Sequence, residues 1–332
     1  MSAGPRLTPL GAGDEVPLRD AATVLLLRDR AVDPGTARAR GGDGAGPPGR
    51  GLEVFMLRRN LRSDFVGGAY VFPGGAVDPH DRADDLEGIC DGRTDAEASA
   101  RLGIDRGGLA FWVAAIRESF EEAGVLLATG PGGDLVVLDD PAIGERFVHH
   151  RRAVDRGERR LVDVCRDEGL RLAVGGMHYF GHWVTPRGAP RRYDTRFFLA
   201  AAPPAQTPLH DDREVIANLW IRPDDALERH RSGAYEMLPP TVASLRAMAR
   251  FSSTAEALQA AAEIVDVPRV EPRVVQDAGG VRIVLPGDAE YGEGYVGRTA
   301  LDAWPSMADR SARAARSVLS EGTAAADPRS TT

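Results

Sequence analysis

The segment 113–125 constrains the fold of this 332-residue chain more than any other part of the sequence. Its apolar residues recur at spacings of three and four, which is the pattern of a helix with one buried face. These residues are Val113, Ile116, Phe120 and Ala123. Gly124 follows at the position where a glycine commonly ends a helix. The sequence therefore predicts a helix that ends at Gly124 and packs one face against a core.

Three glutamates occupy another face of this helix. Glu118, Glu121 and Glu122 stand at i, i+3 and i+4, so their carboxylates share one side. Like charges at these spacings destabilise a helix, although Arg117 offsets part of the repulsion from its position four residues before Glu121. An exposed acidic face is the ordinary explanation of such a pattern. The alternative is a metal site, because carboxylate oxygens are the ligands that Mg²⁺ prefers.

The order of residues favours the second explanation. Residues 117–125 fit the pattern R-E-U-x-E-E-x-G-U, in which U is a bulky apolar residue, and depart from it only at Ser119. This pattern is the second half of the Nudix box, and residues 72–75 (Phe-Pro-Gly-Gly) resemble the strand and loop that enter it. The chain thus resembles the Nudix hydrolases. The resemblance implies an α/β fold in which a mixed β-sheet is sandwiched between helices.

The first half of the box departs from the family pattern, which runs G-x5-E-x7-R-E. Gly75 and Arg117 are 42 positions apart where the pattern has 14, so about 28 residues are inserted. The x5 spacing from Gly75 ends on Asp81 instead of a glutamate. Glu87 and Glu97 are the other candidates for this acid, and the sequence does not choose among the three.

The enlarged loop resembles the Nudix branch that includes the peroxisomal coenzyme A diphosphatases of animals. Residues 181–186 (Gly-His-Trp-Val-Thr-Pro) and 192–199 (Arg-Tyr-Asp-Thr-Arg-Phe-Phe-Leu) also resemble that branch. Asp194 and Arg196, in the second of these segments, are candidates for substrate binding. A strand-entry turn is the alternative interpretation for Asp194.

Two arginines form a further candidate substrate contact. Arg58 and Arg59 follow a strand predicted over residues 52–57. Guanidinium groups bind phosphate oxygens well, so the pair is suited to a substrate phosphate. A solvated strand end is the alternative.

The resemblance assigns the metal ligands. It implies that Glu118, Glu121 and Glu122 bind Mg²⁺ or Mn²⁺, joined by the backbone carbonyl of Gly75. Arg117 would orient Glu121 through a charge-assisted hydrogen bond. A metal held in this way can neutralise phosphate charge, activate a water molecule and stabilise the leaving group.

The general base is less well determined. The family uses either the first glutamate of its R-E-x-x-E-E sequence or a distant loop acid. Glu118 is favoured here over Glu214, which precedes a strand predicted over residues 215–221. Asp211 and Asp212 rank behind Glu214.

The predicted activity is hydrolysis of the diphosphate in a nucleoside diphosphate linked to another group. Coenzyme A and its thioesters are the favoured substrates, and ADP-ribose, NADH and nucleotide sugars are the alternatives. A second hypothesis is a catalytically silent Nudix-fold module that binds a nucleotide. Its support is Asp81 in place of glutamate and Ser119 in place of an apolar residue.

Composition excludes several other classes of protein. The net charge is −8, from 41 basic and 49 acidic residues, which argues against nucleic-acid binding. All the basic residues are arginines, so Schiff-base lysines and Walker A phosphate loops are excluded. The N-terminus lacks the apolar core of a signal peptide, and no apolar run could span a bilayer. A cytoplasmic protein without a membrane partner is predicted, and its oligomeric state, a homodimer included, is left open.

The chain divides by composition around one catalytic domain. Residues 141–170 inside that domain have a helical pattern, with an exposed face predicted at residues 149–152. Low-complexity and charged segments mark the remaining boundaries. The predicted parts are a flexible N-terminus (1–17), a Nudix domain (18–238) with a low-complexity loop (31–51) and a box insertion (76–108), a C-terminal extension packed on the domain (239–302), and a disordered tail (303–332).

Overall fold

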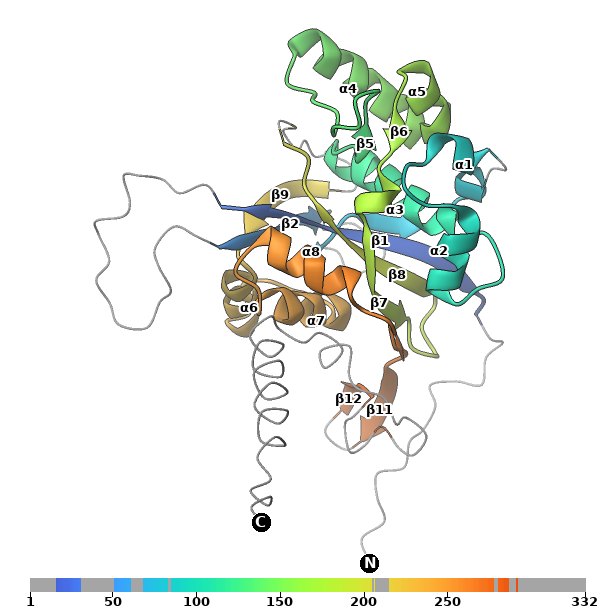
Figure 1. The fold of residues 1–332 in the computed structure, drawn as a ribbon. Coiled ribbons are helices and arrows are strands. Elements are labelled where there is room, and N and C mark those ends of the chain that lie inside the picture. Colours follow the sequence, from blue (N-terminus) through green and yellow to red (C-terminus); the bar gives the residue numbers. More distant parts are fainter. Residues whose placement is uncertain are drawn as a thin grey trace, which may run out of the picture.

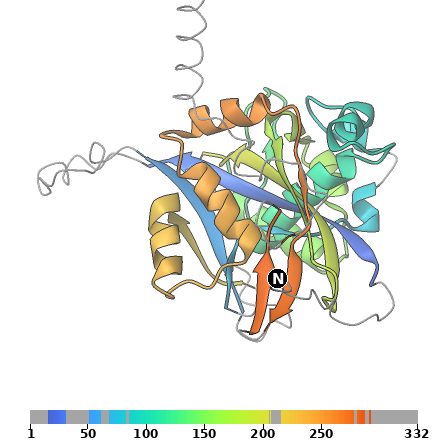
Figure 2. The same ribbon diagram turned by 90° about the horizontal axis from the view of Figure 1, so that it is seen from below.

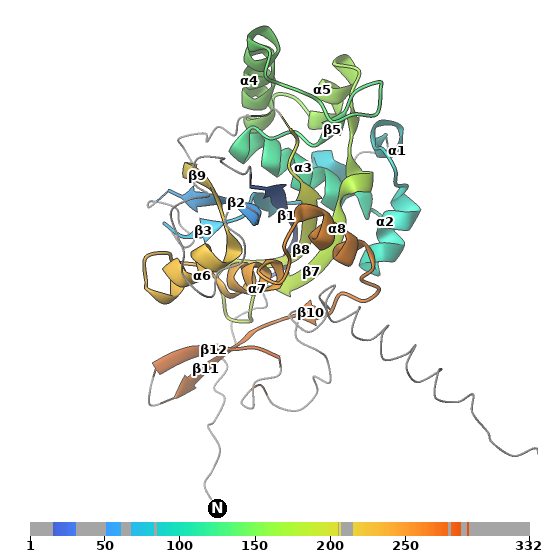
Figure 3. The same cartoon turned by 60° about the vertical axis from the view of Figure 1, so that its left-hand side comes forward.

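In the computed structural model, a β-sheet lies between two layers of helices (Figure 1, Figure 3). The structure describes residues 16–30, 51–60, 68–82, 85–204, 206, 215–277, 280–286 and 291. The predictions for the N-terminus, the low-complexity loop and the C-terminal tail fall almost entirely outside these residues. Those for Asp211, Asp212 and Glu214 also lie outside them.

The described strands of the main sheet are β1 Leu18–Asp29, β2 Leu52–Arg59, β3 Tyr70–Val71, β4 Gly74–Ala76, β7 His178–Val184, β8 Arg192–Ala201, β9 Val215–Ile221 and β10 Arg269–Val270. Their spatial order is β10-β7-β8-β1-β2-β3, with β4 beside β1 and β9 beside β2. Strand β1 is parallel to β8, and β10 is parallel to β7. The other pairs are antiparallel, so the sheet is mixed, as predicted.

One face of the sheet carries the helices α1 Leu86–Ile89, α2 Asp95–Leu102, α3 Leu109–Ala123, α4 Pro141–Asp155 and α5 Leu161–Asp167. Helix α3 lies directly on the sheet, where Trp112 and Ile116 join one buried apolar cluster with Leu26 and Phe198 of the strands. Helices α4 and α5 project beyond α3 (Figure 1). Alternate residues of β1 point to this face, as the two-residue period of a strand requires.

The opposite face carries α6 Pro223–Arg231, α7 Pro239–Met248 and α8 Thr254–Ala262. Leu25, Met56 and Leu199 of the strands join Leu245 and Ala257 of these helices in a second buried cluster. Figure 2 shows the helices lying across this side of the strands. Two apolar clusters separated by the sheet define an α/β/α sandwich, which confirms the predicted fold class.

Smaller elements complete the described chain. A short pair joins β5 Ala128–Thr129 to β6 Arg171–Leu172, and a hairpin joins β11 Arg273–Asp277 to β12 Gly280–Val284. The 3₁₀ turns are η1 Pro79–Arg82 and η2 Val174–Gly176. No helix in the described ranges is both long enough and apolar enough to cross a membrane.

The C-terminal end of α3 explains why serine stands at an apolar position of the box. Ser119 is fully buried, and its hydroxyl donates a 3.0 Å hydrogen bond to the carbonyl of Val125. Gly124 has the predicted left-handed conformation (φ 69°), and its N–H donates to the Phe120 carbonyl. Ser119 therefore holds the chain that leaves the helix, and its polar group is satisfied.

Candidate active site

The three box glutamates are largely buried instead of forming an exposed acidic face. Helix α3 turns them toward the loop around β4, and the side chains of Glu118 and Glu121 are 14% and 15% exposed. Glu122 is buried as well. Burying several carboxylates is unfavourable unless cations or hydrogen bonds compensate. The site must therefore supply such partners.

Strand β4 brings two glycines against α3. Ala22 and Thr23 of β1 pair with Gly75 and Gly74, respectively. This register sets the position of β4 along the sheet next to α3. The N–H of Gly74 donates a 3.1 Å hydrogen bond to Oε2 of Glu122. These contacts bring Gly75 to the helix face that carries the glutamates.

Replacing each glycine with alanine separates the stability of this loop from its function. A Cβ on Gly75 would lie 2.5 Å from Oε1 of Glu118, the end of a flexible side chain. A Cβ on Gly74 would lie 2.6 Å from the Ala22 carbonyl oxygen, which is backbone. We expect Gly74→Ala to lower the free energy of unfolding by about 1–3 kcal/mol, the usual cost of overpacking.

In contrast, Gly75→Ala should displace Glu118 and reduce turnover much more than stability. Denaturant titrations and turnover numbers of both variants, measured in parallel, test this expectation. Equal stability losses in the two variants would contradict it.

Arg117 is the main cation among the buried acids. Its Nη1 lies 2.8 Å from Oε2 of Glu121 and 2.9 Å from Oε1 of Glu118. Its Nε donates to Oδ1 of Asp81 at 3.0 Å, and its Nη2 donates to the carbonyl of Ala76 at 2.8 Å. The predicted pairing of Arg117 with Glu121 is confirmed, and the same guanidinium also ties the box loop to the helix.

Three acids, Asp81, Glu87 and Glu97, were candidates for the first half of the box. Only Asp81 among these three contacts Arg117 in the structure. Asp81 is only 1% exposed, and η1 holds it through a 2.8 Å hydrogen bond from the Asp78 N–H. Glu87 instead accepts from the N–H of Asp95, and Glu97 caps the N-terminus of α2. The residue at the family spacing from Gly75 is thus the one that contacts the arginine of the box helix. Its role as the first-half acid of the box stays a prediction.

Burial shifts the titration of two carboxylates in this group. Burial and the neighbouring Glu118 raise the pKa of Glu121 to about 7, against the lowering effect of Arg117. Burial likewise raises the pKa of Asp81 despite its contacts with Arg117. Buried carboxylates whose pKa values are raised in this way are chemically suited to a hard divalent cation, which would favour their charged forms.

The oxygen donors fit such a cation, although they are not already arranged around one. Among the described residues, no group of three acidic, histidine or cysteine side chains is placed to hold a metal ion. Glu118 and Glu121 face Arg117, and Glu122 faces the N–H of Gly74. Binding a metal would therefore require these side chains to turn while the backbone stays in place.

Helix α4 adds a contact that sequence reasoning missed. The buried Arg151 donates from Nε to the carbonyl oxygen of Glu121 at 2.8 Å. This bond satisfies a carbonyl in the last turn of α3, where a positive charge is favourable. His150 is also buried and bonds Glu168 at 2.9 Å. The prediction of an exposed face at residues 149–152 is therefore wrong for both residues, because this face of α4 packs on α3 and α5.

The structure places Asp194 and Arg196 in a separate polar group. His182 of β7 lies 2.7 Å from Oδ1 of Asp194, and Arg196 contacts both of them. The Arg196 guanidinium also lies over the ring of Phe111 at 5.6 Å. Burial lowers the pKa of His182, and hydrogen bonding and ion pairing hold the pKa of Asp194 below its usual value. A substrate role for Asp194 and Arg196 stays a prediction.

Arg58 and Arg59 differ in their surroundings. The Arg58 guanidinium lies 5.8 Å from the ring of Tyr70, which stacks on Tyr235 and packs against the apolar cluster opposite α3. A register irregularity between Arg58 and Arg59 interrupts the pairing of β2 with β9. The structure therefore does not bring Arg58 to the box helix, and a phosphate contact by either arginine stays a prediction.

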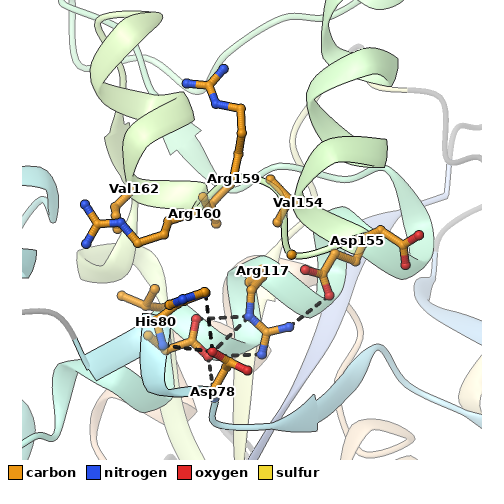
Figure 4. A pocket seen from close by; sticks show the side chains of 13 residues that line it. Asp78, His80, Arg117, Val154, Asp155, Arg159, Arg160 and Val162 are labelled. Atoms are coloured by element: carbon orange, nitrogen blue, oxygen red, sulfur yellow. Dashed lines mark hydrogen bonds and ion pairs between the residues drawn. The ribbon is translucent and has the colours of Figure 1, made fainter.

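A cavity of about 160 Å³ adjoins the Arg117 group (Figure 4). Residues of η1 and α3 line one side, and the turn between α4 and α5 lines the other. Glu121 and Arg117 belong both to this cavity and to the box. The α4–α5 segment therefore extends the site beyond the box residues.

Comparisons with known proteins agree with this geometry. The profile of the NUDT19 Nudix domain matches residues 93–248, a range that begins after Gly75 and Asp81. Acyl-coenzyme A diphosphatase NUDT19 of Gallus gallus is 30% identical over 299 residues, covering 75% of this chain and 78% of its own. The Homo sapiens protein of the same name is 29% identical, with 74% of each chain covered. A NUDIX hydrolase structure from Alicyclobacillus acidocaldarius matches with a TM-score of 0.56 and 27% identity, covering 74% of this chain and 96% of that one.

The sandwich fold and the buried R-E-x-x-E-E helix define a hydrolase of diphosphate bonds. The chain belongs to the Nudix hydrolase family, in the branch that contains the NUDT19 proteins.

Proposed function

We propose that the protein is a metal-dependent diphosphatase of coenzyme A and its thioesters. Two relatives that share about three quarters of the chain are named acyl-coenzyme A diphosphatases, which supports this substrate class. The observation that carries the chemistry is the group of largely buried carboxylates on α3 and η1: Asp81, Glu118 and Glu121 meet at Arg117, and Glu122 lies beside them at the N–H of Gly74. Such a cluster of carboxylate oxygens suits a divalent cation and, through it, a diphosphate.

The metal ligands would be Glu118, Glu121 and Glu122, together with the carbonyl of Gly75. Bound Mg²⁺ or Mn²⁺ would supply charge neutralisation at the diphosphate and a water of lowered pKa. Arg117 pairs with Glu118 and Glu121, and it would offset part of their charge until a metal takes over these oxygens. The N–H of Gly74 holds Glu122 beside the loop in the same way.

Glu118 is our candidate for the general base that takes the proton of the attacking water. It lies beside Gly75, and Arg117 holds one of its oxygens. A base must come within hydrogen-bond reach of the proton that it removes, and a glutamate at the diphosphate satisfies this requirement. Glu214 remains the alternative.

The two departures from the box pattern that support a catalytically silent module also fit an active enzyme. Asp81 reaches Arg117 although it is shorter than glutamate, and Ser119 replaces an apolar contact with a hydrogen bond. Both departures from the box pattern are therefore compatible with an intact site. The acids that a silent module would lack are all present.

A product assay tests the proposal. The full chain is incubated with coenzyme A, acetyl-coenzyme A, ADP-ribose, NADH or a nucleotide sugar, each with Mg²⁺, Mn²⁺ or a chelator. We expect coenzyme A to yield 3′,5′-ADP and 4′-phosphopantetheine with the highest kcat/KM, and the chelator to abolish turnover. Faster hydrolysis of another substrate would assign the enzyme to that substrate, and undiminished turnover in chelator would overturn the metal dependence.

A further inference from the structure

The cavity beside the box helix has a wall that the box itself does not provide. Asp78, just before η1, and His80 of η1 lie on one side of Arg117, and the turn after α4 closes the other side. Val154 and Asp155, at the end of α4, belong to its lining (Figure 4). Because Arg117 and Glu121 also line it, a group bound here would be next to the diphosphate site.

The charges in this cavity do not suit a phosphate. Its lining carries four carboxylates and three guanidinium groups. Arg117 is shared among box acids, Arg159 lies 2.5 Å from Asp167, and Arg160 lies 2.6 Å from Asp163. Figure 4 shows Arg159 and Arg160 turned away from Arg117. A phosphorylated nucleoside would therefore meet acids here without a guanidinium directed at it.

Apart from His80, the remaining lining is apolar and belongs to α3 and the α4–α5 segment. Val113 lies on the box helix, while Val154, Leu161 and Val162 come from the opposite wall. A volume of about 160 Å³ corresponds to roughly five water molecules, which is room for a short section of a chain. Apolar walls beside carboxylate acceptors suit a ligand with methyl groups and N–H or O–H donors.

We propose that this cavity binds the uncharged arm of coenzyme A, at the section next to the diphosphate. That section carries two methyl groups, a hydroxyl and an amide. The methyl groups would contact the valines, and the hydroxyl and amide N–H would donate to Asp78 or Asp155. This inference rests on the proposed function and adds the orientation of the substrate: the phosphorylated adenosine leaves the site on the other side.

Binding of the two product halves tests this orientation directly. Isothermal titration of the full chain with Mg²⁺ measures the Kd of 4′-phosphopantetheine and of 3′,5′-ADP separately. The variant His80→Trp adds bulk to the cavity lining from an exposed position. We expect it to weaken 4′-phosphopantetheine binding about tenfold or more and to leave 3′,5′-ADP binding unchanged.

A second variant tests the role of the negative charge at Asp155 in the cavity lining. Asp155→Arg should also weaken 4′-phosphopantetheine binding, because it removes an acceptor. If the phosphorylated adenosine occupied the cavity, the new cation would instead tighten 3′,5′-ADP binding. His149→Trp and Asp105→Arg make the same exchanges at exposed positions outside the cavity lining and serve as matched controls.

The outcomes separate this proposal from the proposed function. Wild-type protein that hydrolyses coenzyme A but shows no selective loss of 4′-phosphopantetheine binding in His80→Trp overturns the cavity assignment alone. Equal weakening of both halves also overturns it, as does wild-type protein that fails to bind 4′-phosphopantetheine. Selective loss in a protein that does not hydrolyse coenzyme A supports the cavity and overturns the proposed function.

Discussion

Glu122→Gln should lower the turnover number about a thousandfold while the protein stays folded. The substitution keeps an oxygen that can accept the 3.1 Å hydrogen bond from the N–H of Gly74, so the loop contact survives. It removes one negative charge from the candidate metal ligands. A thousandfold loss corresponds to about 4 kcal/mol of transition-state stabilisation, within the range that a catalytic metal contributes.

The measurement is kcat at saturating coenzyme A over a series of Mg²⁺ and Mn²⁺ concentrations. Thermal unfolding and circular dichroism report whether the fold is retained. Glu145→Gln, at an exposed position of α4, makes the same exchange away from the site and should leave kcat unchanged. Glu121→Gln should behave like Glu122→Gln. A Glu122→Gln enzyme within threefold of wild type would remove Glu122 from the catalytic group.

The residue pattern was sufficient for the box helix and its buried face, whereas the layers around it were implied by the family resemblance. The spacing of Val113, Ile116, Phe120 and Ala123 predicted the face that packs on the sheet, and all four are buried. Gly124 ends α3 in the predicted conformation. These features depend on local periodicity and on one residue type with unusual backbone freedom, so neighbouring residues are enough to reveal them.

The partners of the box acids could not be predicted in the same way. Arg151 is 30 residues from Glu121, and its contact depends on how α4 packs across the end of α3. The cavity wall at Val154 and Val162 has the same origin. Asp81 could be predicted in part. The sequence left it as one of three candidates with Glu87 and Glu97, and the 3₁₀ turn η1 is what brings it to Arg117. Long-range packing leaves little signal in a single sequence.

Arg117→Met should destabilise the protein by about 3–5 kcal/mol, the usual cost of removing one partner from a buried ion pair. Asp81, which is only 1% exposed, would lose its cationic partner, and Glu118 and Glu121 would lose the same partner. Arg166→Met is the matched control, since Arg166 pairs with two acids but is 49% exposed. An exposed pair contributes at most about 1 kcal/mol. Denaturant unfolding in chelator, so that no metal compensates, measures both variants.

The cause of the loss can be separated from lost packing by removing the orphaned charge. In the Arg117→Met background, Asp81→Asn should restore part of the stability, because a neutral amide costs less to bury and can still accept from the Asp78 N–H. In the wild-type background the same change should be destabilising, since it takes a carboxylate from Arg117. The sign of Asp81→Asn should therefore reverse between the two backgrounds. The deficit of Arg117→Met should also be smaller at pH 5 than at pH 8, because the pKa values of Glu121 and Asp81 are already raised and protonation at low pH removes their repulsion. If Asp81→Asn is destabilising in both backgrounds, Arg117 acts through its packing and not through its charge.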